Sequence, residues 1–344
     1  MSAERLAALS RWPLAVAPMA GGPSTPALVT AALEAGAFAF VAGGYRSADA
    51  LMAEMAEVRE ATHRPFGVNL FVPGEPTTSP EALARYLVAL EVDQARLGVA
   101  LGDPVWDDDD YPAKLEAVLA QPPALVSFTF GCPAPDTLAA LAAAGSLVAV
   151  TVTNPAEARA VAALGVDALC LQGCEAGAHR GHFANVDRPD QDRTLASLLA
   201  SIRRVTRLPL IAAGGLSTPA DLRWALSAGA TWAQFGTAFL RCPESGANAT
   251  YKAALADVGG GRTAVTRAYS GRRARGLVNR FMEEHHSAPA AYPEINNATR
   301  PLRAAAAAAG DAGGLSLYAG TGVAGARDEP VAQVVERLVS GLPL

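Results

Sequence analysis

The sequence is poor in cysteine, in aromatic residues and in charge. Only four of its 344 residues are cysteine, 6% are aromatic and 18% are charged. The cysteines (Cys132, Cys170, Cys174 and Cys242) show neither a CxxC pair nor zinc-ligand spacing, which argues against a zinc site. No apolar run is long enough to span a bilayer, and the first dozen residues lack the apolar core of a signal peptide. We therefore expect a reduced, cytoplasmic protein.

The charge balance also excludes classes of function. The net charge is −5 and the pI is about 5.6, so the chain lacks the basic footprint of a nucleic-acid-binding protein. A hydrophobic share of 51% in a chain of this length is enough to bury a large core. One α/β barrel with an added segment fits the length as well as two ordinary domains do.

Eight short apolar runs alternate with stretches of helical length. They are continuously apolar rather than alternating, which is typical of parallel strands covered on both faces. Cap residues and prolines begin several of the intervening helices, at Thr25-Pro26, Asn154-Pro155 and Thr218-Pro219. The pattern predicts an α/β fold, a (β/α)8 TIM barrel. The expected strands are Leu14–Pro18, Phe38–Ala42, Phe66–Val72, Leu125–Phe130, Leu147–Val152, Ala168–Leu171, Leu208–Ala213 and Trp232–Phe239.

Two segments are too long for a simple barrel. The chain between Val72 and Leu125, and the chain after Phe239, are each far longer than one helix, whereas a closing helix needs only about a dozen residues. We expect residues 1–240 to form the barrel and residues 241–324 to form a smaller, mostly helical cap over the carboxyl ends of the strands. The closing helix is expected to come from residues 325–344, and Asp103–Tyr111 to reach the cap from the barrel side.

The ends of the seventh and eighth expected strands carry glycines, namely Gly214 and Gly215, then Gly236 followed by Thr237. In TIM barrels, phosphate is often held by the loops after these two strands. Glycine lets backbone N–H groups approach a phosphate closely. Glycines that merely turn the chain are the alternative, but their position at two strand ends favours a phosphate site.

Amide side chains lie at the ends of two other strands, Asn69 at the third and Gln172 at the sixth. A flavin lying across a barrel mouth needs side chains that can both donate and accept hydrogen bonds along its pyrimidine edge, as amides do. Either amide alone fits a surface or capping role better. Both at the same rim favour a ligand.

The segment Gln172–His182 is the most informative stretch. Its glycines allow the loop to press its backbone onto a flat ring. His179 projects from the loop with a charge that is adjustable near neutral pH, and we expect it to be the catalytic residue. A structural histidine is one alternative. A metal pair of His179 and His182 lacks an evident third ligand, so no metal is expected, and Cys174 has no assignable base and is interpreted as a bystander thiol.

Taken together, these stretches resemble class I nitronate monooxygenases, formerly called 2-nitropropane dioxygenases, over nearly the whole chain. No single segment is specific, but their order and spacing are. The matching segments are Ala17–Leu28, Asn69, Gln172–Gly181, Pro209–Thr218, Ala233–Phe239, Ser270–Asn279 and Leu317–Gly322.

The resemblance implies an FMN-dependent barrel with a small helical second domain, in which His179 faces the flavin. The chain departs from the family pattern at Ala178, where a glycine is usual, and at Tyr318 and Thr321, where Trp or Phe and Gln are common. These departures bear on the identity of the substrate more than on the binding of the flavin. The implied FMN contacts are Met19, Asn69, Gln172, Gly177, Gly214, Gly215, Gln234, Gly236 and Thr237.

Three tyrosines, Tyr111, Tyr292 and Tyr318, are expected around the substrate pocket. Each lies in a loop or cap segment near one of the motifs, and a phenol combines apolar bulk with one polar handle. Packing within the cap is an equally good alternative for each of them.

The implied activity is the oxidation of alkyl nitronates with O₂ to a carbonyl compound and nitrite, with neutral nitroalkanes left open as further substrates. A protonated His179 would hold the nitronate oxygens, whereas a neutral one would take the α-proton of a nitroalkane. The expected partners are therefore a small nitronate and O₂, with neither nucleic acid nor membrane. Whether the chain forms a homodimer is left open.

Other activities remain on the same fold. The main alternative is an NAD(P)H-dependent FMN reductase of quinones or enoyl thioesters, for which a separate Rossmann motif is not required. A lysine at a strand end would indicate a flavin-free, phosphate-binding aldolase or isomerase, and none of the eight ends has one. A non-catalytic flavin-binding protein would not explain His179.

Overall fold

Eight parallel strands form the centre of the computed structural model, which describes residues 2–186, 192–257 and 262–342. The strands are β1 (Leu14–Val16), β2 (Phe40–Ala42), β3 (Gly67–Phe71), β4 (Leu125–Thr129), β5 (Leu147–Val152), β6 (Ala168–Gln172), β8 (Leu210–Ala213) and β9 (Trp232–Phe235). Their order is β1-β9-β8-β6-β5-β4-β3-β2, and a parallel bridge between Ala15 and Phe38 brings the two ends of the sheet together. Each lies within an expected strand or passes it by one residue, and the predicted TIM barrel is confirmed.

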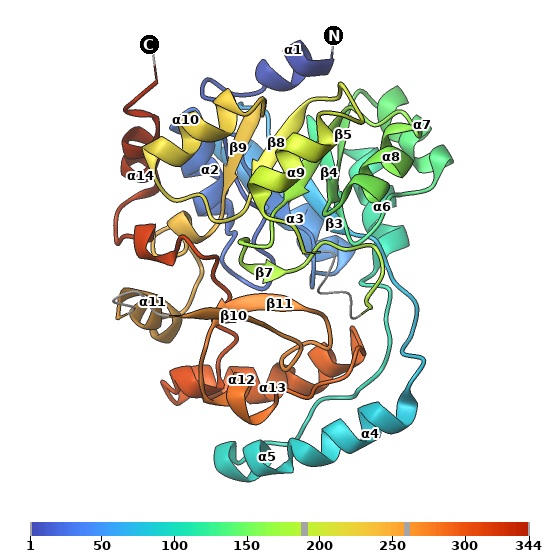
Figure 1. The fold of residues 1–344 in the computed structure, drawn as a ribbon, viewed down its shortest axis with the longest axis vertical. Coiled ribbons are helices and arrows are strands. Elements are labelled where there is room, and N and C mark those ends of the chain that lie inside the picture. Colours follow the sequence, from blue (N-terminus) through green and yellow to red (C-terminus); the bar gives the residue numbers. More distant parts are fainter. Residues whose placement is uncertain (1, 187–191, 258–261, 343–344) are drawn as a thin grey trace.

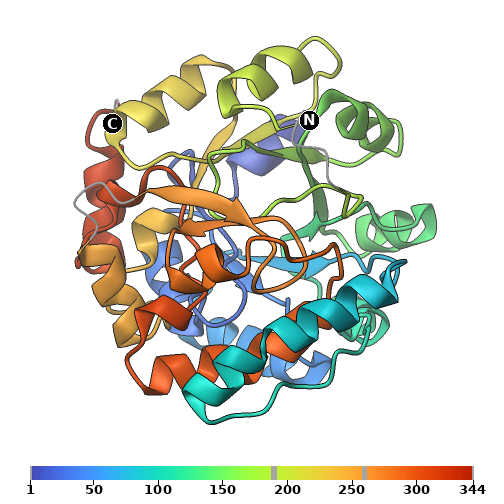
Figure 2. The ribbon, with the colours of Figure 1, turned by 60° about the horizontal axis from the view of Figure 1, so that its bottom comes forward.

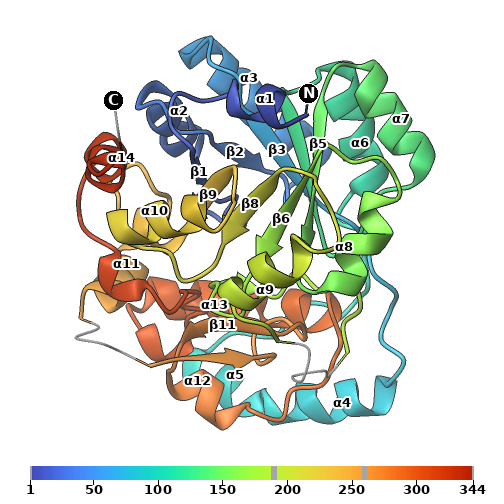
Figure 3. The same ribbon diagram turned by 45° about the horizontal axis from the view of Figure 1, so that its top comes forward.

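Apolar side chains cover both faces of the barrel strands, the inner face and the face toward the outer helices, as their continuously apolar sequences require. Inside the barrel, Phe38 contacts Phe40 and Trp232 with ring centroids 5.1 and 4.9 Å apart. Helix α1 (Ser2–Ala7) adds the buried Leu6 to this inner cluster, at the end of the barrel opposite the cap (Figure 3). A larger cluster fills the layer between the strands and the outer helices.

The outer helices begin where the sequence places their caps. The side chains of Thr25, Asn154 and Thr218 accept hydrogen bonds from backbone N–H groups in the first helical turn. The last helix, α14, packs between α2 and α10 and closes the ring of outer helices (Figure 1). The outer helices are α2 (Pro26–Glu34), α3 (Ala48–Ala61), α6 (Tyr111–Ala120), α7 (Pro135–Ala143), α8 (Pro155–Ala162), α9 (Leu195–Ile202), α10 (Pro219–Ser227) and α14 (Val331–Val339).

The cap covers the carboxyl ends of the strands and contains a sheet as well as helices (Figure 1). This sheet was not anticipated, since one of its strands has only two residues and no readable pattern. Strand β7 carries His179, and its pairing with β11 joins the loop after β6 to the cap. The cap elements are α11 (Ala249–Ala256), α12 (Arg280–Glu284), α13 (Glu294–Ala308), β7 (Ala178–His179), β10 (Thr263–Thr266) and β11 (Ala274–Leu277).

The long segment between β3 and β4 also joins the cap, further than the expected contribution of Asp103–Tyr111. Its helices α4 (Pro80–Ala89) and α5 (Glu91–Leu97) lie across the outer side of the cap (Figure 2). The buried Asp93 carboxylate lies 2.5 Å from His285 Nε2 and 2.7 Å from Arg96 Nη1. Arg96 also contacts Glu284, so this group is best described as an ion-pair network that fastens α5 to α12.

None of the described helices is both long and apolar enough to cross a bilayer.

Candidate active site

A cavity of about 610 Å³ lies between the strand ends and the cap, within the usual size range of ligand pockets. His179, Tyr318 and all the residues expected to contact FMN line it. The topology therefore brings together side chains from the loops after β1, β6, β8 and β9 and from α13.

The glycines after β8 and β9, which the sequence predicts to hold a phosphate, lie in the cavity wall with backbone conformations that need glycine at two positions. Gly214 and Gly215 have φ angles of +127° and +73°, which favour glycine. A methyl group on Gly214 would lie 3.1 Å from the backbone nitrogen of Ala176. Within the described residues, the N–H groups of Gly214, Gly215, Gly236 and Thr237 donate no hydrogen bond. Unpartnered N–H groups at two adjacent strand ends fit a phosphate.

The two amides have different roles from each other. Asn69 is buried, and its amide nitrogen donates to Ser127 Oγ (2.8 Å) and Thr129 Oγ1 (3.1 Å), which fixes its orientation in the cavity. Gln172 uses its amide within its own loop. Its nitrogen donates to the His179 carbonyl (2.9 Å), and its oxygen accepts from Arg180 Nη1 (2.8 Å). Gln172 therefore holds the loop of His179 as well as lining the cavity.

The loop that carries His179 is packed tightly under the cap. A methyl group on Gly177 would lie 2.6 Å from the backbone of both Ala319 and Gly320, so this glycine permits a close approach between the loop and the cap. Ala178 adopts a left-handed φ of +60°, which costs an alanine more than a glycine. The position where the family usually has glycine is thus strained by its side chain.

His179 is enclosed by aromatic rings and by two cations. Its ring centroid lies 5.3 Å from Tyr318, 5.6 Å from Tyr292 and 6.0 Å from Phe130. Burial, and the nearby charges of Arg272 and Arg303, lower the pKa of His179 to about 3. The imidazole is therefore neutral at physiological pH, which argues against the protonated form considered from the sequence.

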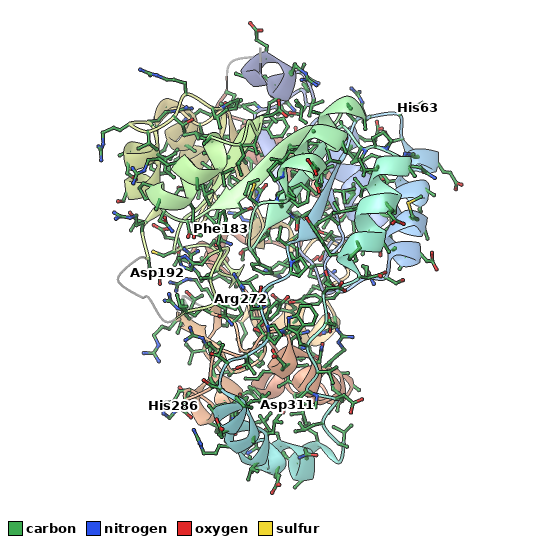
Figure 4. The ribbon with its side chains drawn as sticks, turned by 90° about the vertical axis from the view of Figure 1, so that its right-hand side faces the viewer. His63, Phe183, Asp192, Arg272, His286 and Asp311 are labelled. Atoms are coloured by element: carbon green, nitrogen blue, oxygen red, sulfur yellow. The ribbon has the colours of Figure 1, made fainter. Side chains whose placement is uncertain are left out.

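Arg272 is a buried cation at the junction of barrel and cap (Figure 4). Its guanidinium carbon lies 3.8 Å from the ring centroid of Phe130. Its nitrogens donate to the backbone carbonyls of Arg180 and His182. None of the described carboxylates forms an ion pair with it, and its positive charge helps to lower the pKa of His179.

The tyrosines are only partly where the sequence predicted them. Tyr318 lines the cavity, and Tyr292 lies behind it, with its hydroxyl 3.1 Å from that of Tyr45. Tyr111 was expected at the pocket, but it is the first residue of α6, packs against the barrel core and does not line the cavity. Tyr45 lines the cavity instead; nothing in its sequence surroundings distinguished it.

Three further residues of the site were not singled out from the sequence. Arg303 lies in the Ala-rich part of α13, which reads as a structural helix, yet its side chain lines the cavity. Ser270 and Arg272 lie in a segment that carried the family resemblance, but their contacts with the loop of His179 are long-range and leave no local signal.

Comparison with known proteins gives a consistent result over the whole chain. The family model for nitronate monooxygenase matches residues 4–341. The nitronate monooxygenase of Pseudomonas aeruginosa is 40% identical, and the alignment covers 96% of each chain. That of Paraburkholderia phytofirmans is 37% identical, with 95% of this chain and 91% of the relative covered.

Solved structures agree. Nitroalkane oxidase from Streptomyces ansochromogenes is 46% identical, with a TM-score of 0.96 over 98% of this chain and 97% of the other. FabK from Thermotoga maritima is more distant, with 25% identity and a TM-score of 0.71 over 98% and 94% of the two chains. On the match of the family model and the identity of these relatives, the chain belongs to the nitronate monooxygenase family.

Proposed function

We propose that this protein oxidises alkyl nitronates with O₂, by means of bound FMN, to a carbonyl compound and nitrite. The observation that carries the proposal is the charge of the cavity. Arg46, Arg300 and Arg303 line it, and no acidic side chain among the described residues does. An anionic substrate and an anionic cofactor both suit such a site.

The residues present fit FMN. The free N–H groups at Gly214, Gly215, Gly236 and Thr237 would hold its phosphate, and Asn69 would face its ring from the end of β3. Bound FMN would supply the electron acceptor that the protein lacks. Met19, Gln172, Gly177 and Gln234 also line the cavity and complete the expected contact set.

The protein's own part in the reaction is to bind and orient the nitronate. Arg303 Nε is buried without a hydrogen-bond partner among the described residues, and the charge of this side chain favours an anion nearby. His179 offers one hydrogen bond from a neutral ring. The cap lies over the strand ends and limits the access of water (Figure 1).

Neutral nitroalkanes are the second candidate substrate, because a 46%-identical structure is that of a nitroalkane oxidase. Such a substrate must lose its α-proton to a base. A histidine whose pKa is about 3 is a weak base at neutral pH. Nitronates arrive already deprotonated and need no such step, so they are the better substrates for this site. The FMN reductase alternative rests on the more distant FabK likeness.

The experiment is to assay the purified yellow protein with three substrate sets: a preformed nitronate with O₂, the matching neutral nitroalkane with O₂, and NADH with a quinone. Nitrite formation and O₂ uptake with the nitronate support the proposal. Turnover of NADH and quinone, without nitrite from the nitronate, would replace it with the reductase. A colourless protein that cannot be reconstituted with FMN would contradict the cofactor.

A further inference from the structure

Asp109 connects a buried cation of the barrel to the loop between β2 and α3. Its Oδ2 lies 2.8 Å from Nζ of Lys114, which belongs to α6 and is 1% exposed. Its Oδ1 accepts a hydrogen bond of 2.8 Å from the backbone N–H of Tyr45. The buried ion pair fixes the carboxylate, and the carboxylate in turn fixes the backbone of the loop at Tyr45.

Tyr45 has an unfavourable backbone conformation, which these contacts stabilise. Its φ is +64°, in the left-handed region that disfavours residues with a side chain. The next aspartate, Asp110, holds the same loop, since its Oδ2 accepts from the Ala48 N–H at 2.7 Å. In this conformation the Tyr45 ring lies 5.5 Å from that of Phe71, and Tyr45 lines the cavity.

The hydroxyl groups of Tyr45 and Tyr292 share one hydrogen bond and leave one proton unused. Their oxygens lie 3.1 Å apart, and within the described residues neither has another hydrogen-bond partner. Burial raises the pKa of both phenols, so both are protonated at physiological pH. The bond between them uses one of the two protons, whichever hydroxyl donates. The other proton is available to a ligand in the cavity that Tyr45 lines.

The pair lies beside His179, because the Tyr292 ring is 5.6 Å from the imidazole. We propose that this hydroxyl pair donates a hydrogen bond to an oxygen of the bound nitronate, and that Asp109 is the positioning residue that holds Tyr45 for the contact. That the anion is a nitronate rests on the proposed function. Tyr45 is then a substrate-binding residue that lies outside the segments of family resemblance.

Calorimetric titration of the holoprotein with butanoate tests the contact without turnover. Butanoate carries a planar anionic group with two oxygens, as a nitronate does. Removing the hydroxyl in Tyr45→Phe should weaken its binding by about 10- to 100-fold, the usual worth of a hydrogen bond to a charged group. The value of kcat/KM for a preformed nitronate should fall by a similar factor. Unchanged affinity for butanoate would overturn the proposal.

Tyr111 provides the matched control for the loss of a phenol hydroxyl. Its hydroxyl is buried without a hydrogen-bond partner among the described residues, and Tyr111 does not line the cavity. Tyr111→Phe should therefore leave the affinity for butanoate unchanged, and a loss equal to that of Tyr45→Phe would overturn the proposal.

The wild type separates this proposal from the proposed function. A wild type that binds butanoate through Tyr45 but forms no nitrite from a nitronate would contradict the proposed function and leave the contact standing. A wild type that binds no butanoate would contradict an anion site in the cavity, and with it both proposals.

The positioning role of Asp109 is tested in the Lys114→Met background, because Asp109→Ala alone would leave a buried charge unpaired, which is strongly destabilising. With the lysine removed, Asp109→Asn still offers an oxygen to the Tyr45 N–H, whereas Asp109→Ala does not. We expect the Asn variant to bind butanoate nearly as well as the wild type. The Ala variant should bind it about 10-fold less tightly, the usual worth of one hydrogen bond.

A double-mutant cycle with Tyr45→Phe separates positioning from a general loss of stability. If Asp109 acts through the Tyr45 hydroxyl, Asp109→Ala should cause no further loss of affinity in the Lys114→Met background once Tyr45→Phe is present. Equal affinities of the Asn and Ala variants, or a full additional loss in the absence of the hydroxyl, would overturn the positioning role.

Discussion

Arg272 of the cap stacks on Phe130 of the barrel, with its guanidinium carbon 3.8 Å from the ring centroid. The contact joins the two parts of the molecule directly beside His179, whose ring lies 6.0 Å from that of Phe130. It also holds a buried positive charge close to the imidazole. Burial, this charge and that of Arg303 lower the pKa of His179 and keep its ring neutral.

The stability of the protein should depend on the titration of His179. Its folded pKa of about 3 lies below the ordinary value of about 6.5, so below pH 6.5 the unfolded state binds a proton that the folded state excludes. The stabilisation is therefore complete above pH 6.5 and is lost as the pH falls toward 3. Urea unfolding should show that the wild type loses up to about 2 kcal/mol more than His179→Asn between pH 7 and pH 5. Equal losses in the two proteins would contradict the neutral, enclosed ring.

Gly236 offers a clean test of the proposed phosphate site. Its φ is −109°, and an added methyl would meet only Ala17 Cβ at 3.5 Å and Met19 Sδ at 3.8 Å, so Gly236→Ala should fold normally. Because the methyl points toward these two cavity-lining residues, it should weaken FMN binding by at least about 10-fold, or about 1.4 kcal/mol. Fluorescence titration of the apoprotein measures this. Gly74→Ala is the control, since nothing lies within 4 Å of its added methyl; unchanged affinity in Gly236→Ala would place the phosphate elsewhere.

Replacing Ala178 with glycine should maintain or slightly raise the stability of the protein. Its φ of +60° strains an alanine by about 1 kcal/mol, which the greater freedom of glycine in the unfolded state partly offsets. We expect Ala178→Gly to be as stable as the wild type or slightly more stable in thermal unfolding. Ala176→Gly, two residues away and without a positive φ, should be destabilised. A clear loss of stability in Ala178→Gly alone would mean that its methyl packs favourably enough to outweigh the strain.

The charge of the cavity can be tested by replacing either of two arginines with glutamine, the partly buried Arg303 or the exposed Arg300. Arg303 is held by hydrogen bonds to Asn296, whereas Arg300 is exposed at the same cavity. Arg303→Gln should raise KM for a preformed nitronate by about 10-fold with a smaller change in kcat. Arg300→Gln should have a weaker effect that disappears at high salt, since exposed charges are screened. Steady-state kinetics at two ionic strengths measure both effects. A larger effect of Arg300→Gln than of Arg303→Gln would contradict the role given to Arg303.

The barrel was predictable from sequence because its signals are local. Apolar runs, cap residues such as Thr218 and Asn154, and glycines at strand ends each act within a few residues of chain. The positions of His179 and of the glycines after β8 and β9 at the cavity could be predicted once the strands were counted, because each lies in the loop after a strand end. The Ser270–His179 and Arg272–Phe130 contacts could not be predicted, because they join residues 91 and 142 positions apart and depend on how the cap packs. The position of Tyr111 could not be predicted either. Its distance from the pocket depends on how α6 packs on the barrel, which no local pattern in the sequence shows.

The central claim is that a neutral His179 serves a substrate that is already an anion. It is tested most directly by comparing kcat/KM for a preformed nitronate and for the freshly dissolved neutral nitroalkane, in the same buffer at pH 7, by nitrite formation before the two forms interconvert. The account predicts that the nitronate is used at least about 100-fold more efficiently, the lower range of what a general base contributes. Equal efficiency for the two forms would show that a base in the site removes the α-proton of the nitroalkane efficiently, and would contradict the account.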